Sequence, residues 1–362
     1  MKFNFDGNKL YYHPKRVSDW LTNEFSVFPI YIEISLSNFC NHACIFCALD
    51  FCLKQTKNLF ATDRLLKLLD EFADCKVKSI LYAGTGEPMI HKDIMKILNY
   101  TASKKIDTAI NTNMVLYTPE KIKESLHYLV WLRASIDAGS KKTYALIHNT
   151  KESDFDIVLK NLEYAVKSKN DKKLNVTIGT QFLLINQNKD EVLMLAKILK
   201  DIGVDYYSIK PYNQHYSSSN NCTVDLITTE FIEYLNCELK KLQTEKFNII
   251  FRKKSFEKTS TKQRDYQKCY GPNFITHLRE DGNIYFCESL YNYQEYILGN
   301  IYKNSFKEIW LSENRKKIFQ KINDDFEYLK NNICRPTCRN NSINNYLWQL
   351  KNPEYVEHIN FI

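Results

Sequence analysis

The sequence contains no apolar run long enough to cross a membrane. A spanning helix needs about 20 consecutive residues that are mostly apolar, and no stretch of the 362 residues approaches that length. The first six residues, Met1 to Asp6, also lack the apolar core that a secretory signal peptide requires. We therefore expect a cytoplasmic protein that has no membrane partner.

The sequence also lacks a long basic stripe, although its net charge is +8. The densest basic runs are short, at 104–105, 172–173 and 252–254, and no helix-turn-helix, zinc-finger or RNA-recognition pattern accompanies them. We therefore expect no nucleic-acid partner. The positive balance is compatible with a modest attraction for anionic small molecules, such as phosphorylated or nucleotide-linked ones.

The chain has eleven cysteines, which in a cytoplasmic protein indicate metal binding rather than disulfides. Apolar residues make up 44% of the sequence, which is enough to form a core. The chain is longer than a typical domain of about 100–200 residues. The simplest organisation is one α/β core with a smaller module appended.

Three of the cysteines are clustered in the sequence C-N-H-A-C-I-F-C, directly after a strand-like run at 31–36. Cys40, Cys44 and Cys47 suffice to hold three irons of a 4Fe–4S cluster, which leaves the fourth iron without a protein ligand. An open metal position is typical of a catalytic site. The alternative is a structural zinc site with His42 or Cys52 as the fourth ligand.

Strand and helix patterns alternate after this loop, which predicts βα units and a parallel sheet. Six strand signals are too few for a closed eight-stranded barrel. The expected strands begin at 31 and continue at 77–82, 107–111, 128–136, 174–184 and 206–209. Helices are expected at 62–72, 92–104, from 119, and at 154–167, 190–201 and 229–244.

The cysteine trio, with an aromatic residue before its last member, resembles the signature of the radical S-adenosylmethionine (SAM) enzymes. Gly84–Pro88, after the second strand, is similar to the G-G-E-P turn of that family. The resemblance implies a partial (β/α)6 barrel over about residues 28–212. It also implies that the open iron binds SAM, and that an electron from a flavodoxin or ferredoxin cleaves SAM to methionine and a 5′-deoxyadenosyl radical.

The resemblance assigns further residues to SAM binding. Gly86, Glu87 and Pro88 would hold the amino group, Arg133 the carboxylate and Ser135 the ribose, while adenine would lie near Phe46 and Gly179. Strand alternation places Arg133 and Ser135 on one face, where polar side chains are costly without partners. Asn111 and Gln181 complete the predicted set, although Asn111 is equally suited to a turn.

A second cysteine set follows in the C-terminal part of the chain: Cys269, Cys287, Cys334 and Cys338. Asp281-Gly282 predicts a hairpin turn between strands at 274–279 and 283–286. The spacing C-x12-G-x4-C resembles the SPASM and twitch modules of the family, which implies one auxiliary 4Fe–4S cluster with all four irons ligated. Such a cluster would accept or relay electrons. A structural zinc site is the alternative.

These patterns divide the chain into an N-terminal extension (1–27), the radical SAM partial barrel (28–220) and a small α+β auxiliary-cluster domain (221–362). The polar segment 217–221 is expected to be the joint. Lys210 and His215, with two tyrosines, lie at the expected barrel mouth, where they either bind a polar substrate or form an exposed loop. Cys222 is the candidate hydrogen-atom donor if the reaction is an epimerisation.

The first hypothesis is therefore a radical SAM enzyme that dehydrogenates or epimerises a carbohydrate, cyclitol or nucleotide-linked sugar. Only 39 residues precede Cys40, whereas peptide-modifying members of the family often carry a longer recognition domain there. The second hypothesis is a maturase of ribosomally made peptides with recognition by a separate protein. The third is a zinc-bound scaffold without catalysis. The sequence does not indicate the oligomeric state.

Overall fold

A computed structural model describes residues 9–53, 57–259, 263–354, 357–358 and 360. One sheet runs through the described chain in the strand order β10-β9-β8-β1-β2-β3-β4-β5-β6-β7. The strands are β1 (Tyr31–Ile34), β2 (Ser79–Tyr82), β3 (Asp107–Thr112), β4 (Trp131–Ser135), β5 (Thr177–Leu184), β6 (Tyr206–Pro211), β7 (Asn248–Phe251), β8 (Ile275–Leu278), β9 (Asn283–Tyr285) and β10 (Ile297–Asn300).

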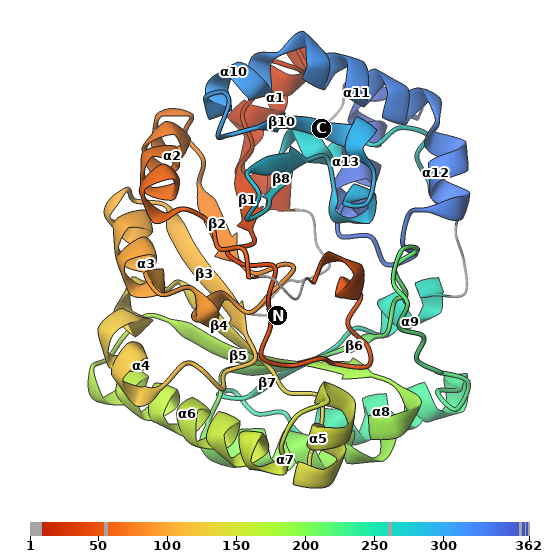
Figure 1. The fold of residues 1–362 in the computed structure, drawn as a ribbon. Helices are drawn as coiled ribbons and strands as arrows, with labels where there is room; N and C mark the ends of the chain where they lie inside the picture. The colour runs from red at the N-terminus through yellow and green to blue at the C-terminus, as the bar shows by residue number, and fades with distance from the viewer. Residues whose placement is uncertain (1–8, 54–56, 260–262, 355–356, 359, 361–362) are drawn as a thin grey trace.

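Strands β1 to β7 pair in parallel with their neighbours, and the connections between β1 and β7 contain helices. These helices lie round the outside of the curved sheet, as Figure 1 shows for α2 to α8. Their bounds are α2 (Thr62–Asp74), α3 (Ile94–Ser103), α4 (Pro119–Ser125), α5 (Lys141–His148), α6 (Glu152–Asp171), α7 (Val192–Ile202) and α8 (Thr229–Leu242). The predicted α/β partial barrel is confirmed.

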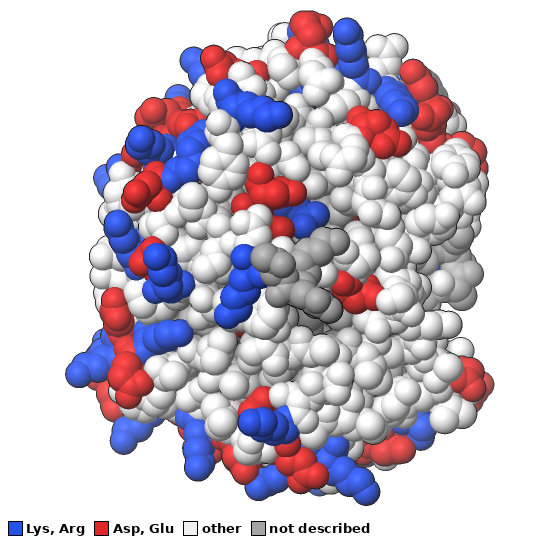
Figure 2. Space-filling view, in the orientation of Figure 1, with Lys and Arg blue, Asp and Glu red and all other residues white. Residues whose placement is uncertain are grey.

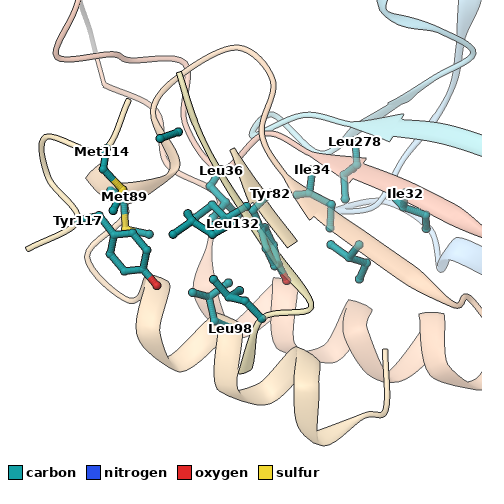
Figure 3. Close-up of a cluster of buried hydrophobic side chains, with 14 of the residues drawn as sticks. Ile32, Ile34, Leu36, Tyr82, Met89, Leu98, Met114, Tyr117, Leu132 and Leu278 are labelled. Atoms are coloured by element: carbon teal, nitrogen blue, oxygen red, sulfur yellow. The ribbon is translucent and has the colours of Figure 1, made fainter. Parts of the chain in front are cut away.

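The two faces of the sheet differ sharply in polarity. The outer face and the helices form the main apolar core, and Figure 3 shows the part of it around Ile34, Tyr82 and Leu98. The inner face carries half-buried polar side chains, among them Arg133 and Ser135 on β4. Because side chains alternate along a strand, each strand contributes to both faces. The polar face is therefore turned into the barrel.

The C-terminal module extends the same sheet beyond β1. Strand β8 pairs in parallel with β1, with Tyr31 opposite Ile275 and Glu33 opposite His277. Strands β8 and β9 form an antiparallel hairpin whose turn contains Gly282 at φ +83°, so the predicted hairpin is confirmed. The module's helices are α9 (Lys253–Thr259), α10 (Phe306–Leu311), α11 (Glu313–Asp324), α12 (Phe326–Asn332) and α13 (Asn341–Lys351).

Helix α8 and strand β7 follow residue 220 but continue the alternation of helices and strands in the barrel. Helix α8 leads into β7, which pairs in parallel with β6, so the sheet continues past the predicted division at 220. The segment expected as a joint contacts the cysteine loop, since Ser218 Oγ donates to the carbonyl of Cys47 at 3.2 Å and Asn220 Nδ2 donates to the same carbonyl at 2.9 Å. The domain boundaries themselves stay a prediction.

The segment before β1 packs on the C-terminal module. In the described part of this segment, α1 (Pro14–Thr22) places Trp20 in a small apolar cluster with Tyr270, Phe274 and Leu347. Further along, the indole N–H of Trp310 donates to the carbonyl of Val27 at 2.7 Å. The described residues before β1 and the C-terminal module thus stabilise one another.

The surface charges are mixed rather than segregated. Figure 2 shows lysine and arginine interspersed with aspartate and glutamate round the rim of the visible face, without a continuous stripe of either sign. Within the residues that the structure describes, no helix combines the length and the apolar character that crossing a bilayer would require.

Candidate active site

The loop of Cys40, Cys44 and Cys47 follows β1 and is held on one side by the turn after β2. The Oγ of Thr85 donates to the carbonyl of Ser37 at 3.1 Å, and the backbone N–H of Glu87 donates to the carbonyl of Phe39 at 3.0 Å. A Cβ at Gly86 would lie 2.4 Å from the same Phe39 oxygen. Glycine is therefore required at this position so that the two loops can approach.

The other side of the cysteine loop rests on the C-terminal end of α5. The last carbonyls of a helix lack partners within the helix. Here the carbonyl of Ile147 accepts from the N–H of Ile45 at 2.9 Å, and that of His148 accepts from the N–H of Ala43 at 3.2 Å. The Nδ1 of His148 also lies 3.2 Å from the sulfur of Cys44.

The thiols of this loop lie close enough for Cys40 and Cys47 to influence the ionisation of Cys44. Burial raises the pKa of Cys44, and the neighbouring Cys40 and Cys47 raise it further. Burial also raises the pKa of Cys40 to about 12, with a contribution from Cys47. Buried thiols that disfavour each other's ionisation are suited to sharing a cationic centre, because a metal stabilises all the thiolates at once. The arrangement fits a cluster held by three thiolates.

The predicted SAM-binding Glu87 is buried and its carboxylate is fully engaged. Its oxygens accept from Thr112 Oγ1 at 2.7 Å, from the N–H of Asn113 at 2.8 Å and from the N–H of Met89 at 3.0 Å. Burial raises its pKa, and these hydrogen bonds oppose that shift. Glu87 therefore joins the ends of β2 and β3. The neighbouring Pro88 begins the short 3-10 helix Pro88–Ile90 and is buried.

The zinc alternative has a geometric counterpart in this region. Ligand atoms of His42, Cys44 and His148 lie within 4.8 Å of one another, the one such His/Cys/Asp/Glu group found in the described parts of the chain. The Nε2 of His42 lies 3.2 Å from a carboxylate oxygen of Asp154, and its buried Nδ1 has no hydrogen-bond partner among the described residues.

Four of the predicted SAM-binding residues lie on the inner face of β3, β4 and β5. Arg133 Nε donates to the Oδ1 of Asn111 at 2.9 Å, and the guanidinium lies 5.2 Å from the ring centre of Trp131. Ser135 and Gln181 stand opposite one another in the register of β4 and β5. The structure therefore gathers Asn111, Arg133, Ser135 and Gln181 on one surface.

Gly179 and Phe46 lie against side chains of the protein itself. A Cβ at Gly179 would lie 2.0 Å from the ring of Tyr206, so the glycine makes room for that tyrosine. Phe46 packs edge-on against the ring of His148, with ring centres 5.4 Å apart. Their predicted contact with adenine stays a prediction.

The three predicted substrate residues occupy different environments. Lys210 precedes the last residue of β6, lies on the inner face and is half-buried. His215 is buried, with Nε2 3.2 Å from the carbonyl of Glu288 and Nδ1 accepting from the N–H of Ser217 at 3.0 Å, so both ring nitrogens are engaged. The thiol of Cys222 is buried in the core and donates to the carbonyl of Ile45 at 3.3 Å. Through these hydrogen bonds, His215 contacts the C-terminal module and Cys222 contacts the cysteine loop.

The second cysteine set is brought together from distant parts of the C-terminal module. Burial raises the pKa of the Cys287 thiol, and the neighbouring Cys334, Cys269 and Cys338 raise it further. Asn344 Nδ2 donates to the sulfur of Cys269 at 3.3 Å. Four converging thiols fit one fully ligated cluster.

The sequence analysis missed two arginines of this module, of which Arg339 connects it to the barrel and Arg335 makes an ion pair within it. Arg339 pairs with the buried carboxylate of Glu33 on β1 and donates to the hydroxyl of Tyr31 at 2.9 Å. Arg335 pairs with Glu288. Each arginine directly follows a predicted ligand, Cys334 or Cys338, which could have marked both as candidate site residues. Only the fold shows that Arg339 reaches Glu33 on β1.

Comparison with known proteins identifies the class. The family model of the radical SAM superfamily matches residues 34–209, and that of the SPASM iron–sulfur cluster-binding domain matches residues 269–339. The chain belongs to the radical SAM superfamily and carries a C-terminal SPASM domain. Its cofactors are 4Fe–4S clusters and SAM, so the zinc scaffold is not supported.

Similar proteins carry out several kinds of modification. The tungsten-containing aldehyde ferredoxin oxidoreductase cofactor-modifying protein of Pyrococcus furiosus is 22% identical over 333 residues, covering 86% of this chain and 87% of that protein. A GTP 3′,8-cyclase of Chlorobaculum tepidum is 27% identical over 54% of this chain, and the chain spans 58% of that relative. Streptococcus suis SuiB bound to S-adenosylmethionine shares the fold, with a TM-score of 0.64 and 18% identity over 87% of this chain and 72% of SuiB.

Proposed function

We propose that the protein forms a carbon radical on a small polar substrate inside the barrel, most simply a carbohydrate, cyclitol or nucleotide-linked sugar that is dehydrogenated or epimerised. When bound, SAM supplies the radical that removes a hydrogen atom from the substrate. Cys40, Cys44 and Cys47 would hold the cluster that binds SAM. Cys269, Cys287, Cys334 and Cys338 would hold the auxiliary cluster. A flavodoxin or ferredoxin would donate the electron.

The observation that carries this proposal is the polarity of the inner face of the sheet. Ser135, Gln181 and Ser208 occupy one register row across β4, β5 and β6, above the row of Arg133 and Tyr206. Hydroxyl, amide and aromatic groups in this combination are typical of pockets for polar small molecules. The apolar outer face is closed by the helices, so the polar lining belongs to the barrel interior.

The C-terminal module contributes residues at one end of the barrel interior. Glu288 and Arg335 lie beside cysteines of the second set, and the carbonyl of Glu288 accepts a hydrogen bond from His215 at the end of the barrel. A substrate that contacts both the inner face and the module would lie between the two proposed cluster sites. That arrangement supports an auxiliary cluster that exchanges electrons with the substrate.

The position and contacts of each predicted site residue indicate the role that we propose for it. Arg133, Ser135, Asn111 and Gln181 offer polar groups to SAM from the inner face. Gly86 and Glu87 position the cysteine loop and remain proposed contacts of the SAM amino group. Cys222 stays a proposed hydrogen-atom donor, and the substitution Cys222→Ala should lower turnover only if the product is an epimer.

Deuterium transfer tests the proposed function. The anaerobically reconstituted protein is incubated with SAM, a reductant and deuterated sugar nucleotides, sugar phosphates or aminocyclitols, and 5′-deoxyadenosine is analysed by mass spectrometry. Deuterium in 5′-deoxyadenosine identifies the substrate and the carbon attacked. If only candidate precursor peptides transfer deuterium, the peptide-maturase hypothesis replaces this one. If SAM is never cleaved, the radical function itself is wrong.

A further inference from the structure

The side-chain amide of Asn344 lies against one of the four cysteines that we propose to hold the auxiliary cluster. Asn344 is near the start of α13 and is only 1% exposed. Its Nδ2 donates to the sulfur of Cys269 at 3.3 Å, although 75 positions separate the two residues in the chain. Buried polar groups of folded proteins have hydrogen-bond partners, and here the partner is a thiol. The contact therefore belongs to the surroundings of the second cysteine set.

The orientation of this amide is fixed by a second contact. The Oδ1 of Asn344 accepts from the backbone N–H of Gly271 at 2.6 Å. A backbone N–H can only donate, so turning the amide over would set two donors against each other. The Nδ2 of Asn344 is therefore the atom that faces the sulfur. Glycine at 271 permits this approach, because a Cβ there would lie 2.9 Å from the Cβ of Asn340, which directly precedes α13.

Cys269 is also held at its backbone. Its N–H donates to the Oδ1 of Asn323, near the end of α11, at 2.8 Å. Side-chain amides from two helices of the module thus hold this residue at two atoms, the backbone nitrogen and the sulfur. Outer contacts of this kind orient a metal ligand and influence the properties of the metal that it binds.

An N–H group that faces a ligand sulfur acts unequally on the two redox states of an iron–sulfur cluster. The reduced cluster is the more negative state, so its sulfurs accept the stronger hydrogen bond. Hydrogen bonds to the ligand sulfurs are among the factors that set the reduction potential of such a cluster. The amide of Asn344 would therefore make a cluster that is bound by Cys269 easier to reduce.

We propose that Asn344 is a positioning residue of the auxiliary cluster, which it serves by orienting the Cys269 thiolate and by raising the reduction potential of the cluster. This inference rests on the proposed function, because it takes Cys269 as a ligand. It deepens that function by naming the side chain that favours acceptance of an electron by this cluster.

Redox titration of the anaerobically reconstituted full chain, followed by electron paramagnetic resonance with and without SAM, tests this role. The signal that SAM does not perturb belongs to the auxiliary cluster. In Asn344→Leu, the equilibrium constant for reduction of this cluster should fall at least about threefold, which is a midpoint potential lower by about 28 mV for a one-electron couple. The potential of the signal that SAM perturbs should not change.

Two further variants separate the hydrogen bond from packing. Asn344→Asp keeps an acceptor for the N–H of Gly271 but sets a carboxylate oxygen against the sulfur. At about pH 8.5, where a carboxylate is ionised, it should lower the potential at least as much as Asn344→Leu. Asn345→Leu is the matched control, because it removes the next amide along α13, whose Nδ2 donates to Asp265 at 3.3 Å. Its auxiliary potential should equal that of the wild type.

Three results would overturn the inference. They are an unchanged auxiliary potential in both Asn344 variants, an equal shift in Asn345→Leu, and loss of the auxiliary cluster from both Asn344 variants while the protein stays folded by thermal unfolding. Iron analysis of the wild type separates the two proposals. About eight irons per chain with unchanged potentials would reject the role of Asn344 alone, whereas about four irons would reject the second cysteine set as cluster ligands.

Discussion

The sulfur of Cys44 lies 3.2 Å from the Nδ1 of His148, although 104 positions separate the two residues in the chain. The opposite ring nitrogen of His148 lies 3.4 Å from a carboxylate oxygen of Asp137, just after β4. The same helix end supplies carbonyls to the N–H groups of Ala43 and Ile45. The position of the proposed cluster ligand is thus tied to the β4–α5 connection.

A hydrogen bond from His148 to the Cys44 sulfur should raise the reduction potential of the SAM-binding cluster, because it stabilises the more negative, reduced state. His148→Leu should therefore lower the midpoint potential by a few tens of mV, which corresponds to the roughly 1 kcal/mol of one hydrogen bond. His148→Asn, which can place an amide N–H near the original Nδ1, should restore much of the difference. Redox titration followed by electron paramagnetic resonance measures both. Equal potentials in the wild type and His148→Leu would show that the contact does not tune the cluster.

Loss of one thiol from each cysteine set should remove one cluster and leave the other. Cys44→Ala should reduce the iron content of the reconstituted protein from about eight to about four atoms per chain and abolish 5′-deoxyadenosine formation. Cys338→Ala is the matched control, with a similar loss of iron but with SAM cleavage retained. Iron analysis and chromatography of 5′-deoxyadenosine provide the readouts. Continued SAM cleavage by Cys44→Ala would contradict the role given to this thiol.

The close approach of Tyr206 to Gly179 predicts a sensitive packing position. Gly179→Ala should destabilise the protein by about 1–3 kcal/mol, because the new methyl group would lie 2.0 Å from the ring in the present arrangement. Tyr206→Leu removes the ring atoms that clash. The double variant should then be more stable than the sum of the two single effects by roughly 0.5 kcal/mol or more. Anaerobic thermal unfolding measures the three variants, and strict additivity would show that the ring moves aside freely.

Lys210 should make stability depend on pH in the alkaline range. Its pKa falls from 10.5 to about 7, since burial and the charges of Arg133, Arg252 and Arg335 outweigh that of Glu288. Between these values the native protein binds fewer protons than the unfolded chain, so stability rises with pH from 7 toward 10.5. Lowering the pH through 7 charges the half-buried ammonium group and restores the cost of its desolvation.

Lys210→Met should therefore melt at a higher temperature than the wild type at neutral pH. The difference should shrink as the pH rises toward about 9.5. Asp137, whose pKa burial raises to about 7, still titrates at the lower end of this window, so the comparison is read above about pH 8. Anaerobic calorimetry at a series of pH values measures the difference. A constant difference across the window would mean that Lys210 keeps an ordinary pKa.

The alternating pattern predicted most of the barrel because each strand and helix is specified by its own residues. The strand expected at 107–111 and the helix expected at 62–72 lie within one or two residues of β3 and α2 at either end. Strand β7 was not predicted because it is only four residues long, and it is held by pairing with β6. The eight-residue helix α5 was missed because it follows β4 after a short connection.

The candidate site also combines features that the sequence predicts with features that it does not. The thiol spacing, the turn at Gly86 and Glu87 and the hairpin at Gly282 could be predicted, because they depend on residues adjacent in the chain. The linking roles of Cys222 and His215 could not, because their partners Ile45 and Glu288 lie far away in the sequence.

By itself, the sequence determined the chemistry of this protein, since three closely spaced thiols in one loop form a ligand set wherever that loop lies. The tertiary structure alone decided what surrounds that chemistry. It set His148 against Cys44, Arg339 against Glu33 and Lys210 on the inner face of the barrel. The physical reason is that ligation within a loop is a local property, whereas a contact between distant residues depends on strand register and helix packing.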